Sequence, residues 1–466
     1  MDRLIVISNR EPYVHEYNGE HIDCSVPTGG VVAAIDPVMQ AAKGTWIAWG
    51  SGDADQDCSD AKGCVRVPPT APQYTLRRIW LTQKEVNDYY LGFSNRVIWP
   101  VCHLFQENAQ FKKNYWEVYK SVNQKFAEAA AEELEAGGRV FIQDVHFSLV
   151  PDLLRKKVPE AAIALFWHIP FPAAETFSCI PWRKELLTGL LSADMLGFHT
   201  KAHADNFIST VCREFPQAEV KDNVINYNER KTKIAAIPIG IDYETYAKSG
   251  SAPHILKGAE ATRKSINAER IILGVDRLDY TKGILNRFLA FERYLEANPR
   301  ARGKVSFIQI ASPTRVNINE YKEMKRHVEE TVGRINGRFQ TPSWTPIIYI
   351  NRKIEEDKLL MLYKIADVAM VTPVIDGMNL VAKEYVAVNE KGVLILSEFA
   401  GASEGMKDAI VVNPYDIEAM GKAIQKALRM KQREKINHCQ KLRREVQEHD
   451  IFWWLDEFFR QWEAGC

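Results

Sequence analysis

Residues 271–283 read Ile-Ile-Leu-Gly-Val-Asp-Arg-Leu-Asp-Tyr-Thr-Lys-Gly. The first five form a short apolar run that is typical of a buried strand. Polar residues then end the strand, and an amphipathic pattern from Gly283 to Glu296 predicts a helix. A strand, a turn and a helix make the repeating unit of an α/β fold. Arg277 and Lys282 would then lie at the carboxyl end of the strand, where such sheets bind ligands.

The same alternation of strands and helices recurs along the whole chain. Further apolar runs predict strands at 4–8, 45–49, 139–143, 162–168, 195–198, 233–239, 305–310, 346–350, 368–371, 393–397 and 410–412. Helical patterns lie between them, at 114–135, 319–331, 356–366 and 417–430. This order predicts the α/β class, with mostly parallel sheets covered by helices on both faces.

The length of 466 residues is too great for one hydrophobic core and predicts two domains. A polar, helix-prone stretch near 243–268 separates the two series of strands, so we place the domains at 1–240 and 241–445. The remainder, 446–466, is rich in aromatic residues at helical spacing. We expect it to form a helix that packs back on the first domain. Two doubly wound domains would face each other across a cleft at the carboxyl ends of their strands.

The bulk composition excludes several classes of function. Sixty basic and sixty acidic residues balance, which argues against nucleic acid or an anionic membrane as the partner. We expect no leader segment before the first strand, and no apolar run approaches the ~20 residues of a membrane helix. The eight cysteines form no Cys-x-x-Cys motif and resemble the reduced thiols of a cytoplasmic protein. Pairing of Cys58 with Cys64 is the minor alternative.

The basic residues Arg277 and Lys282 predict a site for a diphosphate. Fixed cations at a strand end can stabilise the negative charge that develops on a leaving diphosphate, without a metal. The alternative is a pair of solvated side chains that form surface ion pairs with Asp276 and Asp279. The position after a buried strand, and the second motif below, favour the diphosphate.

The second motif is Asp376-Gly-Met-Asn-Leu-Val-Ala-Lys-Glu384, which follows the predicted strand 368–371. Its turn leads into a helix that we expect to begin near Asn379, with backbone N–H groups available for oxyanions or hydroxyls. Glu384 would lie one to two turns into that helix, where its carboxylate could accept ribose hydroxyls. A helix cap for Asp376 and an ordinary surface role for Glu384 are the competing interpretations.

The first half of the chain has its own polar strand ends. Ser8-Asn-Arg10 ends the first strand, and Arg10 is a natural phosphate ligand there. Gly29-Gly30 follows a polar, hairpin-like segment and would let the backbone approach a ligand closely. Asp144 and His168 end two further strands. A sugar hydroxyl or a carbonyl group is the functional partner that we predict for His168, and a buried structural histidine is the alternative.

Twelve motifs, in order along nearly the whole chain, resemble the trehalose-6-phosphate synthases, the retaining glycosyltransferases of family 20. They are Ser8-Asn-Arg10, Gly29-Gly30, Trp46-Ile-Ala-Trp49-Gly50, Tyr89-Tyr90, Asn95-Arg-Val-Ile-Trp99-Pro100, His168-Ile-Pro-Phe-Pro172, Gly197-Phe-His-Thr200, Pro238-Ile-Gly-Ile241, Val275–Gly283, Arg334-Ile-Asn-Gly337, Asp376–Tyr385 and Ser397-Glu-Phe-Ala-Gly401. The resemblance implies the GT-B architecture of two Rossmann-like domains, with the acceptor on the first and the nucleotide sugar on the second. It also implies front-face transfer of glucose from UDP-glucose to glucose 6-phosphate.

The resemblance also implies a role for each matching residue. The catalytic set would be Arg277, Lys282, His168 and Asp376. The donor would be bound by Gly30, Arg277, Lys282, Asp376, Gly377, Met378, Asn379, Leu380 and Glu384. The acceptor would be bound by Arg10, Trp49, Tyr90, Trp99, Asp144 and Arg315. No cofactor or metal is expected. A separate phosphatase would act on the product, and a homo-oligomer is one option for the assembly.

Three departures from the family pattern keep alternatives open. Ile375 stands where an arginine is expected before the turn motif, Val145 stands where a tyrosine is common, and Glu11-Pro-Tyr13 leads into a longer polar loop. The first departure concerns the donor nucleotide and the last concerns the acceptor. A glucosylglycerol-phosphate synthase that uses glycerol 3-phosphate, and a catalytically silent sugar-phosphate sensor, are therefore the alternative functions.

Overall fold

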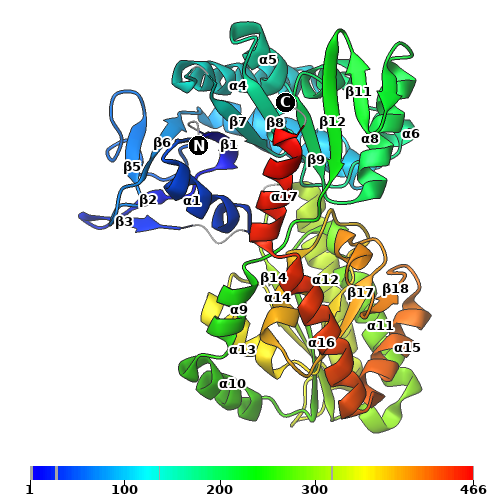
Figure 1. The fold of residues 1–466 in the computed structure, drawn as a ribbon. Coiled ribbons are helices and arrows are strands. Elements are labelled where there is room, and N and C mark those ends of the chain that lie inside the picture. The colour runs from blue at the N-terminus through cyan, green and yellow to red at the C-terminus, as the bar shows by residue number, and fades with distance from the viewer. Residues whose placement is uncertain (1–3, 27–29, 136, 316–317, 465–466) are drawn as a thin grey trace. The chain divides into compact units, whose positions relative to one another are not determined.

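The computed structural model describes residues 4–26, 30–135, 137–315 and 318–464. The chain divides into two compact units. Unit 1 comprises Met1–Ile237 and Trp454–Cys466, and unit 2 comprises Pro238–Trp453. Both are α/β units built on a mainly parallel sheet with helices on its faces (Figure 1), which confirms the predicted class.

The sheet of unit 1 has the strand order β10-β11-β12-β9-β8-β7-β1-β4-β6-β5. Its strands are β1 (Leu4–Arg10), β4 (Thr45–Trp49), β5 (Cys64–Val67), β6 (Tyr74–Ile79), β7 (Arg139–Gln143), β8 (Ala162–Phe166), β9 (Met195–Phe198), β10 (Glu219–Lys221), β11 (Val224–Tyr227) and β12 (Arg230–Ala236). In that order the strands from β12 to β6 are parallel, whereas β5, β10 and β11 add antiparallel pairings at the edges. The winding direction reverses between β1 and β7, which makes that point the switch point of the sheet.

Helices and one hairpin complete unit 1. The hairpin pairs β2 (Val14–Asn18) with β3 (His21–Ser25), as the polar segment predicted. The helices are α1 (Gly30–Ala42), α2 (Gln83–Glu85), α3 (Trp99–Cys102), α4 (Lys113–Glu133), α5 (Val150–Lys157), α6 (Ala174–Phe177), α7 (Arg183–Leu190) and α8 (Lys201–Glu214), together with a π-helix over Val86–Ile98. Helices α4 and α5 lie side by side on the sheet (Figure 1).

The sheet of unit 2 has the strand order β15-β14-β13-β16-β17-β18, and every pairing is parallel. The strands are β13 (Arg270–Arg277), β14 (Val305–Ser312), β15 (Ile347–Ile350), β16 (Val368–Val371), β17 (Val393–Ser397) and β18 (Ile410–Val412). Counted along the chain this is the order 3-2-1-4-5-6 of a Rossmann fold, with its switch point between β13 and β16. Both motifs predicted to bind the donor directly follow these two strands.

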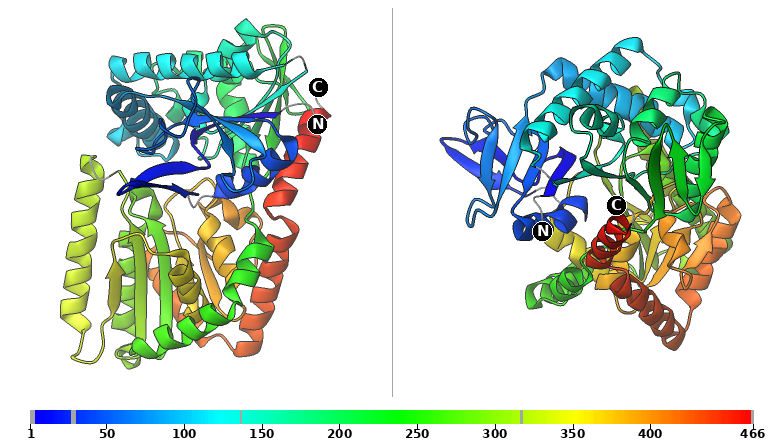
Figure 2. Two further views of the ribbon diagram at one scale, coloured as in Figure 1. Left: turned by 90° about the vertical axis from the view of Figure 1, so that its left-hand side faces the viewer. Right: turned by 45° about the horizontal axis from the view of Figure 1, so that its top comes forward.

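The helices of unit 2 flank this sheet. They are α9 (Tyr243–Gly250), α10 (Pro253–Ser265), α11 (Ile284–Ala297), α12 (Asn319–Phe339), α13 (Glu356–Ile365), α14 (Leu380–Val388), α15 (Ile417–Arg429) and α16 (Gln432–Glu448). Figure 2 shows α12 running alongside the strands. Helix α12 continues past residue 331, where we predicted its end, because Ile335 and Phe339 also belong to the apolar core of unit 2.

The aromatic tail forms α17 (Ile451–Glu463). From Trp454 onward it belongs to unit 1. Its rings pack on the inner strands, with centroids 4.9 Å apart for Trp454 and Phe166 and 4.6 Å apart for Phe458 and Phe141. The aromatic spacing of the tail therefore reflects burial against a sheet.

Candidate active site

The two donor motifs meet at the switch point of the unit 2 sheet. Lys282 follows β13, Asp376 follows β16, and the Nζ atom of Lys282 lies 2.5 Å from Oδ2 of Asp376. Lys282 is 8% exposed, so little water screens this pair. Between the strand and α11, Gly283 has a left-handed φ of 64°, and a Cβ atom there would lie 2.3 Å from the carbonyl oxygen of Thr372. Glycine thus permits the close approach of the segments after β13 and β16.

The acids of the first motif have partners of their own. Asp276 lies 2.5 Å from Nη1 of the buried Arg287. Asp279 accepts from Nη1 of Arg315 at 2.8 Å and from the hydroxyl of Tyr321 at 3.0 Å. These contacts fix both acids on the inner side of the motif, whereas Arg277, at the end of β13, is exposed.

Positive charge gathers around Asp279. Burial alone would raise the pKa of this carboxyl group. The charges of Arg315, Arg277 and Lys282 outweigh that effect and hold the pKa at about 2. The carboxylate is therefore ionised throughout the physiological range, and three cations surround it within one unit. Such a concentration of fixed cations beside a strand end suits a polyanionic ligand.

The turn of the second motif is held by its backbone. The N–H of Asp376 donates to Phe399 O at 3.0 Å, and Met378 O accepts from the N–H of Ala402 at 2.9 Å. Asn379 has a left-handed φ of 76°, and its Nδ2 donates to Asp376 Oδ2 at 3.0 Å. Helix α14 begins at Leu380, one residue after its expected start. The first N–H groups of a helix have no acceptor within it, so those of α14 can donate to hydroxyls or oxyanions.

Glu384 lies on α14 and is half-buried. Its Oε2 accepts from the hydroxyl of Tyr363 at 2.8 Å. Burial raises the pKa of Glu384, while hydrogen bonds from Tyr363 and Tyr246 act in the opposite direction. The two tyrosines come from α13 and α9, and they orient the carboxylate as a fixed acceptor. Sequence reasoning missed both, because neither belongs to a recognisable motif.

The predicted glycine loop is only partly described. Helix α1 begins at Gly30, whereas Thr28 and Gly29 lie outside the described residues. Gly30 therefore occupies the first position of a helix in unit 1.

The predicted acceptor residues, Arg315 excepted, lie in unit 1. Arg10 ends β1 and is exposed, and Trp49 ends the neighbouring β4. The ring of Tyr90 lies 6.2 Å from that of Trp49, and it stacks on His146 with centroids 5.7 Å apart. Trp99 begins α3 and stacks on His103. The π-helix places Tyr90 in this group, and sequence analysis predicted neither that helix nor the contact with His146.

Asp144 and His168 lie side by side after β7 and β8. Oδ1 of Asp144 accepts from the backbone N–H of His168 at 3.2 Å, and Asp144 has a φ of 74°. Nε2 of His168 lies 2.9 Å from Oε1 of Gln143. Burial lowers the pKa of His168 to about 4, so its ring is neutral near pH 7. With Nε2 donating to Gln143, Nδ1 is left as an acceptor for a hydroxyl group.

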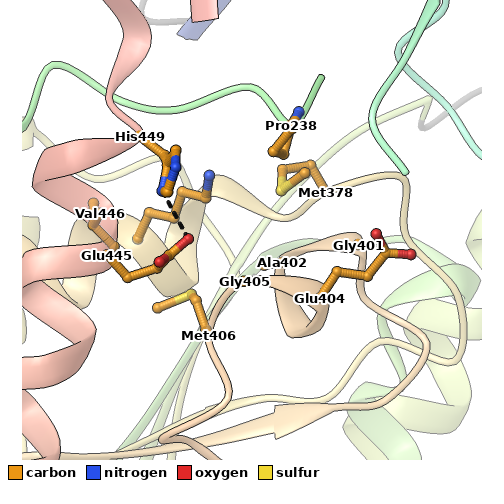
Figure 3. A pocket seen from close by; sticks show the side chains of 11 residues that line it. Pro238, Met378, Gly401, Ala402, Glu404, Gly405, Met406, Glu445, Val446 and His449 are labelled. Atoms are coloured by element: carbon orange, nitrogen blue, oxygen red, sulfur yellow. Dashed lines mark ion pairs between the residues drawn. The ribbon is translucent and has the colours of Figure 1, made fainter. Parts of the chain in front are cut away.

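A cavity of about 210 Å³ adjoins the turn motif within unit 2. Met378 and Lys383 form part of its wall, and burial lowers the pKa of Lys383 to about 8. Figure 3 shows Glu445 and His449 paired at its rim, with Nδ1 and Oε1 2.9 Å apart. Among the described residues, Met378 is the one predicted ligand in this wall, so the cavity adjoins the predicted donor site without containing it.

Other features predicted from composition can be checked in the described residues. The cysteines described there, Cys58 and Cys64 included, are free thiols, so the alternative disulfide is not formed. Within the same residues, no helix is long and apolar enough to cross a membrane. No group of three or more His, Cys, Asp or Glu side chains in the described ranges is arranged to hold a metal ion.

The sequence model of glycosyltransferase family 20 matches residues 2–464, so the chain belongs to this family. It is 37% identical over 469 residues to the bifunctional trehalose-6-phosphate synthase/phosphatase of Thermoproteus tenax, and the alignment covers 98% of this chain and 63% of that protein. The chain thus spans less than two thirds of that relative's length.

Two solved structures are similar over nearly their full length. One is a UDP-forming α,α-trehalose-phosphate synthase from Burkholderia xenovorans in complex with glucose-6-phosphate, with 34% identity, a TM-score of 0.87, and coverage of 99% of this chain and 100% of that one. The other is trehalose-6-phosphate from E. coli bound with UDP-2-fluoro glucose, with 32% identity, a TM-score of 0.89, and coverage of 99% and 98%. With the strand orders above, these matches confirm the predicted GT-B type of α/β fold.

Proposed function

We propose that this protein transfers glucose from UDP-glucose to glucose 6-phosphate, with retention of configuration, and releases α,α-trehalose 6-phosphate and UDP. The observation that carries the proposal is the 2.5 Å pair of Lys282 and Asp376 at the switch point of unit 2. It joins a cationic motif and a sugar-binding turn at the place where Rossmann-like sheets bind nucleotides. The ligands named for the two similar structures support the same donor and acceptor.

Each donor residue then has a defined task. Arg277 and Lys282 would bind the diphosphate, and Asp376 with the amides of Gly377, Met378, Asn379 and Leu380 would bind the glucose hydroxyls. Glu384, oriented by its tyrosines, would accept the ribose hydroxyls. Gly30 would be a further donor ligand. Binding of the diphosphate to Lys282 would compete with its contact to Asp376 and leave that carboxylate for the sugar.

The reaction needs no enzyme nucleophile. The bond between the anomeric carbon of the donor and the diphosphate oxygen breaks, and the anomeric hydroxyl oxygen of the acceptor bonds to that carbon on the same face. The acceptor's proton passes to the departing diphosphate oxygen. Arg277 and Lys282 stabilise the charge on this leaving group. Neutral His168 orients a sugar hydroxyl through Nδ1, and Asp144 supports its backbone.

On the acceptor side we assign the phosphate of glucose 6-phosphate to Arg10 and Arg315, and the sugar ring to Trp49, Tyr90 and Trp99. Arg315 forms an ion pair with Asp279 at 2.8 Å, and a guanidinium group has five N–H donors, enough to serve a phosphate as well. A separate phosphatase would then act on the product. The free thiols agree with a cytoplasmic location, which we include in the proposal.

A panel of substrate pairs tests the proposal. The protein is incubated with UDP-, GDP- and ADP-glucose against glucose 6-phosphate and glycerol 3-phosphate, and the product is identified by NMR. We expect α,α-linked trehalose 6-phosphate from UDP-glucose. The comparison of donor nucleotides is informative because Ile375, beside Asp376, stands where the family pattern leads us to expect an arginine. Transfer to glycerol 3-phosphate alone would favour the glucosylglycerol-phosphate alternative. No transfer from any donor would favour the silent sensor.

A further inference from the structure

A cluster of buried charged side chains lies directly beyond the predicted acceptor residues of unit 1. Its members are Glu11, His15, Asp55 and Arg78, with exposed fractions of 0%, 7%, 0% and 1%. They come from the segment after β1, the hairpin, the segment after β4, and β6. None belongs to the motifs shared with the family, and Glu11 is one of the departures from its pattern.

Arg78 is the centre of the cluster. Its Nε donates to Oε2 of Glu11 at 2.7 Å, and its Nη2 lies 2.8 Å from Oδ1 of Asp55. Nη2 also donates to Tyr13 O at 3.0 Å and contacts Nδ1 of His15 at 2.7 Å. One guanidinium group on β6 thus binds the chain that follows β1 and the chain that follows β4.

The two carboxylates connect those segments through backbone N–H groups. Oε1 of Glu11 accepts from the N–H of Ser51 at 2.7 Å. The two oxygens of Asp55 accept from the N–H groups of His15 at 2.9 Å and Gly52 at 2.7 Å. Glu11 is the residue after Arg10, and Ser51 is two residues after Trp49. Hydrogen bonds of the cluster therefore reach the chain within two residues of each of these predicted acceptor ligands.

Burying four ionisable groups is a costly way to gain stability. Apolar residues of similar volume often stabilise a fold as well or better, whereas buried charge networks can specify one arrangement of the backbone. Here the contacts join two loops that continue directly from the strand ends carrying Arg10 and Trp49. We propose that Glu11 and Arg78 are positioning residues for the acceptor, which hold these two loops in one arrangement. This inference rests on the proposed function.

The ionisation of the cluster supports a link to pH. Burial raises the pKa of Glu11 to about 7, although Arg78 opposes the shift. The ionisable groups around it are Arg78, Asp55 and His15, with the thiol of Cys24 nearby, and burial lowers the pKa of His15. As the pH falls through about 7, Glu11 gains a proton, and its bonds from Arg78 and Ser51 weaken. Acceptor use should then fall with them.

Two conservative variants, Glu11→Gln and Arg78→Lys, test the role, with Arg77→Lys as the matched control. Arg77 is the neighbouring residue of β6, but it pairs with Glu132 and Glu133 of α4 instead. Michaelis constants are measured for both substrates. We expect the KM for glucose 6-phosphate to rise about tenfold in both test variants, because small displacements of positioning groups are costly. The KM for UDP-glucose, and all constants of the control, should stay close to wild type.

Two further measurements separate positioning from general damage. Hydrogen exchange, which needs no turnover, should be faster at the Ser51 amide in Glu11→Gln. The kcat/KM for glucose 6-phosphate in the wild type should begin to decline as the pH falls through about 7. This step should be absent in Glu11→Gln, which should retain only the decline caused by titration of the substrate's phosphate. The substrate's phosphate titrates near pH ~6 and affects both proteins alike. If Arg78→Lys is too unstable to assay, Glu11→Gln and its pH profile decide.

The outcomes distinguish the two proposals. A wild type that does not use glucose 6-phosphate overturns the proposed function. If the wild type uses glucose 6-phosphate but the KM for this substrate is unchanged in both Glu11→Gln and Arg78→Lys, only the positioning role is overturned. An equal rise in the KM values for donor and acceptor, or faster exchange at Ser51 without a change in acceptor KM, also overturns it.

Discussion

Replacing Lys282 by alanine is the most direct test of the donor site. In the structure its ammonium group is 2.5 Å from Asp376 and only 8% of the residue is exposed. In the reaction the same group would face the departing diphosphate. Loss of one preorganised donor of this kind costs about 3–4 kcal/mol, so we expect kcat to fall by about 10²–10³. Arg277→Ala should show a similar loss.

The same substitution affects folding, and that effect must be separated from catalysis. Removal of Lys282 abolishes its ion pair with Asp376, while the hydrogen bond from Asn379 to that carboxylate remains. We expect a loss of about 1–3 kcal/mol in the free energy of unfolding, the usual penalty for a partly buried group that loses a partner. Lys435→Ala is the matched control, because Lys435 is also a buried lysine of unit 2 but lies on α16.

The assay measures UDP release at saturating concentrations of both substrates, with thermal unfolding of each variant in parallel. A folded Lys282→Ala protein with near-normal kcat would refute the role of the cation. So would an equal loss of kcat in Lys435→Ala, because that would trace the effect to the removal of any buried lysine. Calorimetric titration with UDP adds a second reading, since the variant should also bind the diphosphate more weakly.

Three further predictions concern other parts of the site. Glu384→Gln should raise the KM for UDP-glucose about tenfold with a smaller effect on kcat, because a neutral amide is a weaker acceptor for hydroxyl groups; an unchanged KM in initial-rate assays would argue against ribose binding. The pKa of about 2 for Asp279 lies below its ordinary value, so the ionised carboxylate should contribute about 2 kcal/mol to the free energy of unfolding. This contribution should be present in full above pH ~4 and lost as the pH falls towards 2. Denaturant unfolding should therefore show the stability gap between wild type and Asp279→Asn narrowing over that range, and a constant gap would contradict this. Dialysis against EDTA should leave kcat unchanged, whereas a loss restored by Mg²⁺ would show that the fixed cations are not sufficient.

The sequence alone predicted the parts of the fold that depend on local pattern. The strands on either side of the unit 2 switch point are continuous apolar runs, and both donor motifs follow them as expected. Strand β6 was not predicted, because Arg77 and Arg78 interrupt its apolar pattern. Arg78 is neutralised by Glu11, which lies 67 residues earlier in the chain, and the partners of Arg77 lie on α4. These acids are distant from β6 in the sequence, so the residues near β6 alone do not predict that two arginines are buried there.

Several site residues are held by partners that are distant in sequence and that the motifs did not predict. From the sequence, ion pairs of Arg277 and Lys282 with Asp276 and Asp279 were the alternative to a diphosphate site. In the structure Asp279 forms an ion pair with Arg315, 36 residues further on. A tyrosine that orients Glu384 is likewise on another helix. Motif spacing can locate a ligand group, but tertiary packing decides what holds it.

The left-handed Gly283 has a consequence for which sequences this fold can tolerate. A Cβ atom at this position would lie only 2.3 Å from the carbonyl oxygen of Thr372. Even alanine would have to push the segment after β13 away from the segment after β16. In a saturation library, position 283 should therefore be intolerant although it has no side chain to contribute. The two donor motifs can lie this close together only because residue 283 has no Cβ atom. Directed evolution of donor preference should therefore leave Gly283 unchanged.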